Sequence, residues 1–199
     1  YYFAAKLSAS VDDIDLNLED FVQRVNSDVV GKIVNIASRC AGFLAKGFDN
    51  TLAQTCAEPE LLAQFIARGE TIASLYEARE FNKAMREVVA LADRANQYID
   101  EKKPWQLARQ DGGASEVHAV CSVGVNLFRV LMTYLKPVLP AMAAKAESFL
   151  ACSLDWTDLN QSMEGRRLGT FEPLLTRVDS KQVEAMVEAG KARRPAHVR

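Results

Sequence analysis

The feature that most constrains the fold is a long run of residues near the start of the chain in which apolar side chains recur at helical spacing. At about 100° per residue, these side chains form one stripe along a helix that spans residues 17–47. The members of the stripe are Leu18, Val22, Val25, Val29, Ile33, Ile36, Cys40 and Phe43. Asn17 is placed to cap the first turn, and Gly47 is placed to end the helix. The pattern predicts a single helix of about eight turns.

Helical periodicity returns in four further stretches. Pro59 suits the first turn of a second helix that continues to Tyr76, and a third helix is expected over residues 80–99. Pro104 should stop the third helix, because proline disfavours helical backbone in the residue before it. A fourth helix, over residues 115–135, is apolar nearly all round, as the central helix of a bundle would be. The prolines of residues 136–140 lead into a fifth.

The two ends of the chain are less regular. Residues 1–15 are interpreted as the tail of an upstream catalytic region and a connector, and residues 16–151 as the helical domain. Residues 152–179 lack periodicity and are expected to be irregular, with at most a short strand. Ser180 can cap a last helix, which leads into a basic, mobile tail, so that residues 180–199 form a terminal helix and linker. The fold prediction is an all-α bundle of about five main helices.

Composition excludes several classes of protein. The net charge of −2 over 199 residues does not favour a general nucleic-acid binder, so any RNA contact must be local and specific. The four cysteines are widely spaced and only two histidines could join them, which argues against zinc sites and disulfides and for a reduced, cytoplasmic protein. We expect no membrane span and no DNA binding. The first residue is Tyr, so the chain is expected to be a fragment of a longer protein.

Motifs for catalysis are missing. The sequence has no GxxxxGK[ST] or GxGxxG phosphate loop, and neither histidine stands near a plausible nucleophile and acid. Asp12, Asp13 and Asp15 are interpreted as a solvated connector rather than as a metal site. We therefore predict no catalytic residue, no metal ligand and no bound cofactor in this chain.

Two groups of residues are candidates for binding. Asn35 and Arg39 are four residues apart, so they project from the same side of the long helix at the margin of its apolar stripe. Trp105 follows Pro104 at a corner rich in cations, which is a fair platform for an unstacked base. In the alternative interpretation, Trp105 plugs the end of the bundle, while Asn35 caps a loop and Arg39 pairs with an acid. The residues alone favour this structural role.

A family resemblance favours a binding role for these residues over a structural one. Residues 13–39, 80–105 and 123–140 together resemble the C-terminal half of bacterial methionyl-tRNA synthetases, and the similarity extends over nearly the whole chain. In that family the region is a helical anticodon-binding domain that follows a class I catalytic domain. The resemblance implies recognition of the CAU anticodon of methionine tRNAs, in an enzyme that ligates methionine to tRNA using ATP.

The resemblance also implies roles for individual residues. The family's anticodon-reading pair falls on Asn35 and Arg39, and its proline and tryptophan fall on Pro104 and Trp105. Trp105 is then expected to stack on the first anticodon base, a cytosine, while Asn35 and Arg39 bond to base edges. An indole face accepts any base, so specificity must come from donors and acceptors at the edge. The alternatives are the anticodon-binding domain of another class I synthetase and a helical protein-interaction module.

The chain departs from the complete family pattern. The HIGH-type and KMSKS-type sequences and the cysteine knuckles are absent, so this fragment is expected to be inactive, with ATP and zinc belonging to the missing catalytic half. The expected partners are the tRNA(Met) anticodon loop and the chain's own catalytic domain. Residues after Ala151 should return toward that domain and be poorly packed without it, and the apolar residues 1–7 should be exposed.

Overall fold

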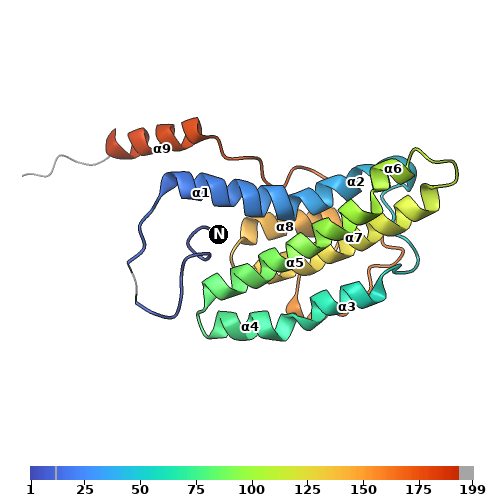
Figure 1. Ribbon diagram of the computed structural model, residues 1–199, viewed down its shortest axis with the longest axis horizontal. Helices are drawn as coiled ribbons and strands as arrows, with labels where there is room; N and C mark the ends of the chain where they lie inside the picture. The colour runs from blue at the N-terminus through green and yellow to red at the C-terminus, as the bar shows by residue number, and fades with distance from the viewer. Residues whose placement is uncertain (12, 193–199) are drawn as a thin grey trace, which may run out of the picture.

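The computed structural model describes residues 1–11 and 13–192, and within these residues it is helical, with an isolated bridge between Thr51 and Arg167 as its only β pairing. The predicted all-α bundle is confirmed (Figure 1). Its elements are α1 (Leu18–Arg24), the π-helical segment η1 (Val25–Val34), α2 (Asn35–Gly47), α3 (Pro59–Ala67), α4 (Gly69–Glu77), α5 (Phe81–Lys102), α6 (Pro104–Leu107), α7 (Ala114–Leu135), α8 (Pro140–Leu150), the 3₁₀ turn η2 (Trp156–Asp158) and α9 (Ser180–Ala192).

The predicted long helix is continuous but not uniform. It begins as expected, because the Asn17 side chain accepts a hydrogen bond of 3.0 Å from the backbone N–H of Asp20. Between α1 and α2, however, the ten residues of η1 form a π-helix, in which each N–H bonds to the carbonyl five residues earlier. A Cβ on Gly31 would lie only 3.0 Å from the Asn26 carbonyl oxygen, five residues earlier, so glycine avoids a crowded contact at this position. The π-helical segment ends immediately before Asn35.

Two predicted boundaries are corrected. The expected second helix is divided at Arg68 into α3 and α4. A Cβ on Gly69 would come within 3.2 Å of the Tyr134 hydroxyl, so the division lies where the chain passes closely over α7. The third helix, α5, continues to Lys102, three residues beyond the predicted end. Lys103 then takes the left-handed conformation, with φ of 50°, and Pro104 starts α6.

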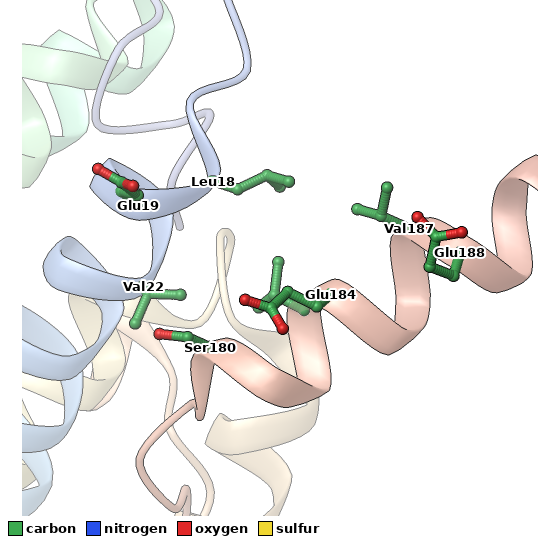
Figure 2. Close-up of a pocket in the computed structure, with 8 residues that line it drawn as sticks. Leu18, Glu19, Val22, Ser180, Glu184, Val187 and Glu188 are labelled. Carbon is green, nitrogen blue, oxygen red and sulfur yellow. The ribbon is translucent and has the colours of Figure 1, made fainter.

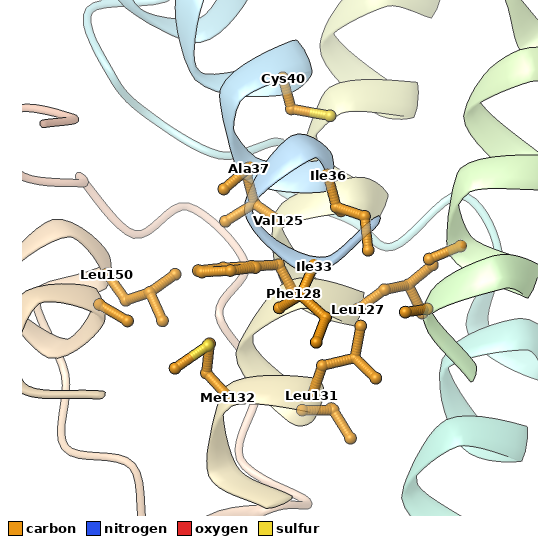
Figure 3. Packing of buried hydrophobic residues seen from close by; sticks show 14 of the residues in the cluster. Ile33, Ile36, Ala37, Cys40, Val125, Leu127, Phe128, Leu131, Met132 and Leu150 are labelled. Carbon is orange, nitrogen blue, oxygen red and sulfur yellow. The ribbon is translucent and has the colours of Figure 1, made fainter. Parts of the chain in front are cut away.

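The centre of the molecule is α7, as its apolar sequence predicted. It is long and apolar enough to cross a membrane by composition, but 89% of its most hydrophobic window is buried inside the bundle, which identifies it as a core helix. Figure 3 shows Ile33, Ile36 and Cys40 of the long helix facing residues of α7 such as Phe128 and Leu131. The two helices approach so closely that a Cβ on Gly124 would lie 2.6 Å from the Cys40 sulfur.

The segment between α8 and α9 is irregular, as expected, but it is not poorly packed. Its apolar side chains Leu154, Leu159, Met163, Leu168 and Leu174 are buried in the common core. Arg129 of α7, only 3% exposed, donates from Nη1 to the Asp158 carbonyl (3.0 Å) and from Nη2 to the Leu159 carbonyl (2.8 Å). The prediction of a loose segment was wrong, because these side chains have partners within the bundle itself.

The helices α1 and α9 form a separate end of the molecule (Figure 1). They border a groove with apolar side chains from both helices, among them Leu18, Val22 and Val187 (Figure 2). The apolar start of the chain is exposed only in part, because Tyr2 is buried while Phe3 is 53% exposed. The basic tail predicted to be mobile comprises residues 191–199. Its first two residues belong to α9, and residues 193–199 lie outside the described residues.

Candidate nucleic-acid interface

The candidate site lies where the start of α2 faces the end of α5. Arg39 donates from Nη2 to Oδ1 of Asp100, and its guanidinium carbon lies 4.7 Å from the centroid of the Trp105 ring. Asn35, one turn earlier on α2, donates to Asn96. The structure therefore brings Arg39 and Trp105 into contact and places Asn35 beside them, on the same side of α2.

Trp105 is held by the turn between α5 and α6. The Lys103 N–H donates to the Ile99 carbonyl (2.9 Å), and the buried Pro104 opens α6. The indole is half-buried and packs against the core, while the Arg39 guanidinium lies over its face. Trp105 is thus neither sealed inside the bundle nor freely exposed. It has a structural contact and a surface that solvent reaches.

The cation over the indole does not come from the cation-rich corner that carries Trp105. In that corner, the ammonium of Lys102 pairs with Glu58 at 3.0 Å and lies over the ring of Tyr98. The cation over the Trp105 ring is Arg39, from a different helix. The Arg39 guanidinium also pairs with Asp100. The ion pair and the contact with the indole together hold the plane of the guanidinium.

Asn35 is anchored to α5 through its side-chain amide. Its Nδ2 lies 3.1 Å from Oδ1 of Asn96, and Asn96 in turn donates to the backbone carbonyls of Lys32 (3.0 Å) and Ala92 (2.9 Å). Both side chains are half-buried. Asn35 therefore does not point into the apolar core, and it keeps hydrogen-bonding capacity on the side away from Asn96.

The surroundings of the site are acidic rather than basic. A shallow depression beside it is lined by Asp93, Asn96, Gln97, Asp100, Glu101 and Lys103. Lys32 pairs with Asp93 at 2.8 Å, as Arg39 pairs with Asp100. Such a surface offers donors and acceptors for base edges, but it attracts a phosphate backbone only weakly.

Comparison with known families gives this geometry a context. The model of the anticodon binding domain of methionyl tRNA ligase matches residues 50–191, and that of class I tRNA synthetases (M) matches residues 1–41. The chain belongs to the methionyl-tRNA synthetase family. The match confirms the predicted family and sets aside the anticodon-binding domain of another class I synthetase.

Solved structures agree with this assignment at the level of the fold. The apo methionyl-tRNA synthetase of Mycobacterium tuberculosis is similar with a TM-score of 0.76 and 20% identity, over 82% of this chain and 35% of that one. The same enzyme in complex with methionyl-adenylate gives a TM-score of 0.75 and 20% identity, over 81% and 34%. The chain thus spans about a third of the length of these methionyl-tRNA synthetases.

Other residues that could carry chemistry have structural roles in this member of the methionyl-tRNA synthetase family. His118 stacks on Phe48 with ring centroids 4.0 Å apart, and its Nε2 lies 2.7 Å from the Thr51 carbonyl oxygen. A hydrogen bond with Cys121, together with burial, holds the pKa of the Cys40 thiol well above its ordinary value, so this thiol is unreactive. Arg166 donates to the Ala151 carbonyl (2.9 Å).

Sequence reasoning missed Asn96 and Asp100, which hold Asn35 and Arg39 in place. Both lie on α5, four residues apart, which is also the spacing of Asn35 and Arg39 on α2. Each residue on α5 follows its hydrogen-bond partner on α2 by 61 residues in the sequence. The signal that could have found them is this equal spacing of polar side chains on two facing helices. It becomes visible only when the two helices are known to pack together.

Proposed function

We propose that this chain recognises the CAU anticodon of methionine tRNAs, as the anticodon-binding part of an enzyme that ligates methionine to its tRNA using ATP. The observation that carries the proposal is the contact between Arg39 and Trp105, with Asn35 one turn away on the same helix. The family assignment supports it, because the matching model is that of an anticodon-binding domain.

In this proposal, the three side chains divide the work by their chemistry. Trp105 offers an aromatic surface on which the first anticodon base, a cytosine, stacks beside Arg39, and stacking of this kind contributes about 1–3 kcal/mol. Arg39 supplies N–H donors for the acceptor atoms of a base, and Asn35 supplies an amide that both donates and accepts. Pro104 positions the indole by fixing the start of α6.

The acidic surroundings limit how the RNA is held. Because Asp93, Asp100 and Glu101 border the site, bases rather than phosphates must provide most of the local binding energy. Binding through bases depends less on salt than binding through phosphates, which releases counterions. We therefore expect a preference for CAU that persists at physiological salt.

We further propose that the end of the molecule around α1 and α9 faces the catalytic domain of the same polypeptide. Five large apolar side chains in residues 1–16 and α9 are exposed, and the class I synthetase model covers residues 1–41. They are Phe3, Leu7, Val11, Leu16 and Met186. In this arrangement the catalytic domain binds ATP, and zinc where the enzyme carries it, and the whole protein works in the cytoplasm. This chain alone is then inactive in aminoacylation and acts only on tRNA.

The test compares binding of two anticodon stem-loops, one with CAU and one with UAU, by fluorescence anisotropy at low and physiological salt. We expect a clear preference for CAU at both salt concentrations. Trp105→Ala should weaken binding of CAU by about 10- to 100-fold. The chain's other tryptophan provides a matched control, because Trp156 packs against Tyr134, with ring centroids 5.0 Å apart, in the irregular segment.

Trp156→Ala should therefore reduce stability without changing the preference between anticodons. Far-UV circular dichroism of each variant verifies that the helices remain. Equal binding of both stem-loops that disappears with salt would contradict the proposal, and complete absence of RNA binding would leave a protein-interaction module as the better explanation.

A further inference from the structure

The orientation of two amides in the site follows from the atoms around them. Asn96 Nδ2 lies 3.0 Å from the Lys32 carbonyl oxygen and 2.9 Å from the Ala92 carbonyl oxygen. A carbonyl oxygen only accepts hydrogen bonds, so the side-chain atom that faces both must be the amide nitrogen. The other atom, Oδ1, then faces Asn35. Asn96 therefore has one favoured orientation, which its two backbone partners determine.

This orientation determines that of Asn35. Because Asn96 presents an oxygen, the Asn35 atom that lies 3.1 Å from it must be the nitrogen, Nδ2. The Asn35 oxygen is then turned away from α5. Among the described residues, no group donates a hydrogen bond to this oxygen. A half-buried acceptor is thereby left available beside Arg39 and Trp105.

We propose that Asn96 is a positioning residue that turns the Asn35 oxygen toward the RNA, so that the site selects a base with an exocyclic amino group. The inference rests on the proposed function and specifies one of its contacts. Cytosine and adenine carry such an amino group, whereas uracil presents a carbonyl oxygen at the equivalent position and would face the Asn35 oxygen without a donor. Asn96 acts through Asn35 and need not touch the RNA.

The same hydrogen bonds connect the amide pair to the backbone. Lys32 belongs to η1, the π-helical segment that ends immediately before Asn35, and its carbonyl accepts from Asn96. The Lys32 side chain also pairs with Asp93, which lies about one turn before Asn96 on α5. Asn96 therefore fixes where the Asn35 backbone lies relative to α5, as well as the direction of its side chain.

The experiment uses the 199-residue chain and stem-loops in which a single amino group is deleted. One stem-loop carries pyrimidin-2-one in place of the anticodon cytosine, and the other carries purine in place of the adenine. In the wild-type chain, deletion of one of these two amino groups should weaken binding by about 3- to 10-fold, as the loss of one hydrogen bond predicts. In Asn96→Leu, deletion of the same amino group should weaken binding much less, because the Asn35 amide is then free to turn.

A matched control exists on the same long helix. Asn26 is also half-buried and also bonds to backbone, since its Nδ2 donates to the Val178 carbonyl (2.9 Å) and its Oδ1 accepts from the Val178 N–H (2.8 Å). Asn26→Leu removes an equivalent amide far from Trp105 along the helix. It should lower stability while the effect of amino-group deletion stays at its wild-type value.

A second substitution that restores the preference for the amino group distinguishes a positioning role of Asn96 from a merely structural one. Asn96→Ser removes the contact with Asn35 by a smaller change, so it covers the case in which Asn96→Leu does not fold. Asn35→Asp, added to Asn96→Ser, supplies an acceptor oxygen whichever way the side chain turns. The double variant should bind all stem-loops more weakly, because of its added charge, but should recover the preference for the amino group. Loss of local structure alone would not be recovered in this way.

Three results would count against these ideas in different ways. A wild-type chain that does not distinguish CAU from UAU contradicts the proposed function and this inference together. A wild-type chain that distinguishes them but tolerates both amino-group deletions overturns the inference alone. Retention of the amino-group effect in a folded Asn96→Leu or Asn96→Ser variant also overturns the inference alone.

Discussion

The two ends of the long helix carry similar apolar patterns but have different surroundings. At the end formed by α2, Ile36, Cys40 and Leu44 are completely buried against the rest of the bundle. At the end formed by α1, Leu18 and Val22 are only half-buried and border the groove next to α9. A periodic stripe thus identifies the face of a helix that can be buried. It does not say whether the described chain supplies enough partners to bury it.

The polar residues of the two ends differ in the same way. Asn26, near α1, bonds to the backbone of Val178 on both sides of its amide, so its hydrogen-bonding capacity is used to hold the segment before α9. Asn35, at the start of α2, makes one contact to α5 and keeps an unused acceptor. The first amide therefore holds two segments of the chain together, whereas the second keeps an acceptor for the RNA contact proposed above.

The largest expected difference between the two ends is in stability. Leu44→Ala removes a fully buried side chain and should lower the free energy of unfolding by about 2–5 kcal/mol. Leu18→Ala removes a half-buried side chain and should cost less than about 1 kcal/mol. Urea denaturation followed by circular dichroism measures both. Equal losses would mean that the groove beside α9 is as well packed as the core.

A second prediction concerns the close approach of α2 and α7. Gly124→Ala places a methyl group where the Cys40 sulfur lies 2.6 Å away, and should destabilise the fold by about 1–3 kcal/mol. Adding Cys40→Ala makes room and should recover part of this loss. Gly42→Ala, on the exposed face of α2 with no atom within 4 Å, is the control and should stabilise the helix by up to about 1 kcal/mol.

Replacing one arginine at each end of the long helix should affect RNA recognition at the α2 end only. Arg39→Gln should reduce the discrimination between CAU and UAU by about 1–3 kcal/mol, because a donor to a base edge is lost. Arg24→Gln, which breaks the pair with Asp20 (2.8 Å) in α1, should leave discrimination unchanged. Binding constants for both stem-loops measure the effect. An equal loss of affinity for both anticodons in Arg39→Gln would identify a phosphate contact instead.

The smallest predicted effect concerns the start of the irregular segment. Hydrogen bonds from the Lys136 ammonium and the Leu154 N–H hold the pKa of the Glu147 carboxyl below its ordinary value of 4.5. Because the folded pKa is depressed, this interaction stabilises the fold above pH 4.5 and is lost as pH falls through the folded pKa. Glu147→Gln should therefore be slightly less stable than wild type at pH 7, and the difference should shrink below pH 4.5. A difference independent of pH would mean that the amide itself disturbs the packing.

Much of the fold could be predicted because its signals are local. As expected, Asn17 caps the long helix, Pro59 opens α3, and α5 ends before Pro104. The apolar run of α7 marked it as the central helix. These features depend on propensity and periodicity within a few turns of chain, which the sequence displays directly.

The remaining features depend on contacts between distant segments. The π-helical segment η1 has no periodic signature, and its carbonyl at Lys32 is bonded by Asn96 from another helix. The residues that hold Asn35 and Arg39 come from α5, and no pattern within α2 reveals them. Residues such as Leu159 and Met163 are buried without periodicity, since an extended segment can place any side chain inward. Asn35, Arg39 and Trp105 were candidates from their spacing and from the Pro104 corner, but only the family resemblance favoured binding over a structural role for them.

The buried guanidinium of Arg129 has a consequence for the order in which the molecule is completed. Its carbonyl partners follow it by 29 and 30 residues in the chain, so on the ribosome α7 is synthesised before they exist. Until then the cation must remain hydrated, because burying it unpaired would be costly. The core can therefore finish folding only after Leu159 has been synthesised. A nascent chain stalled before that point would stay incompletely folded and accessible to proteases.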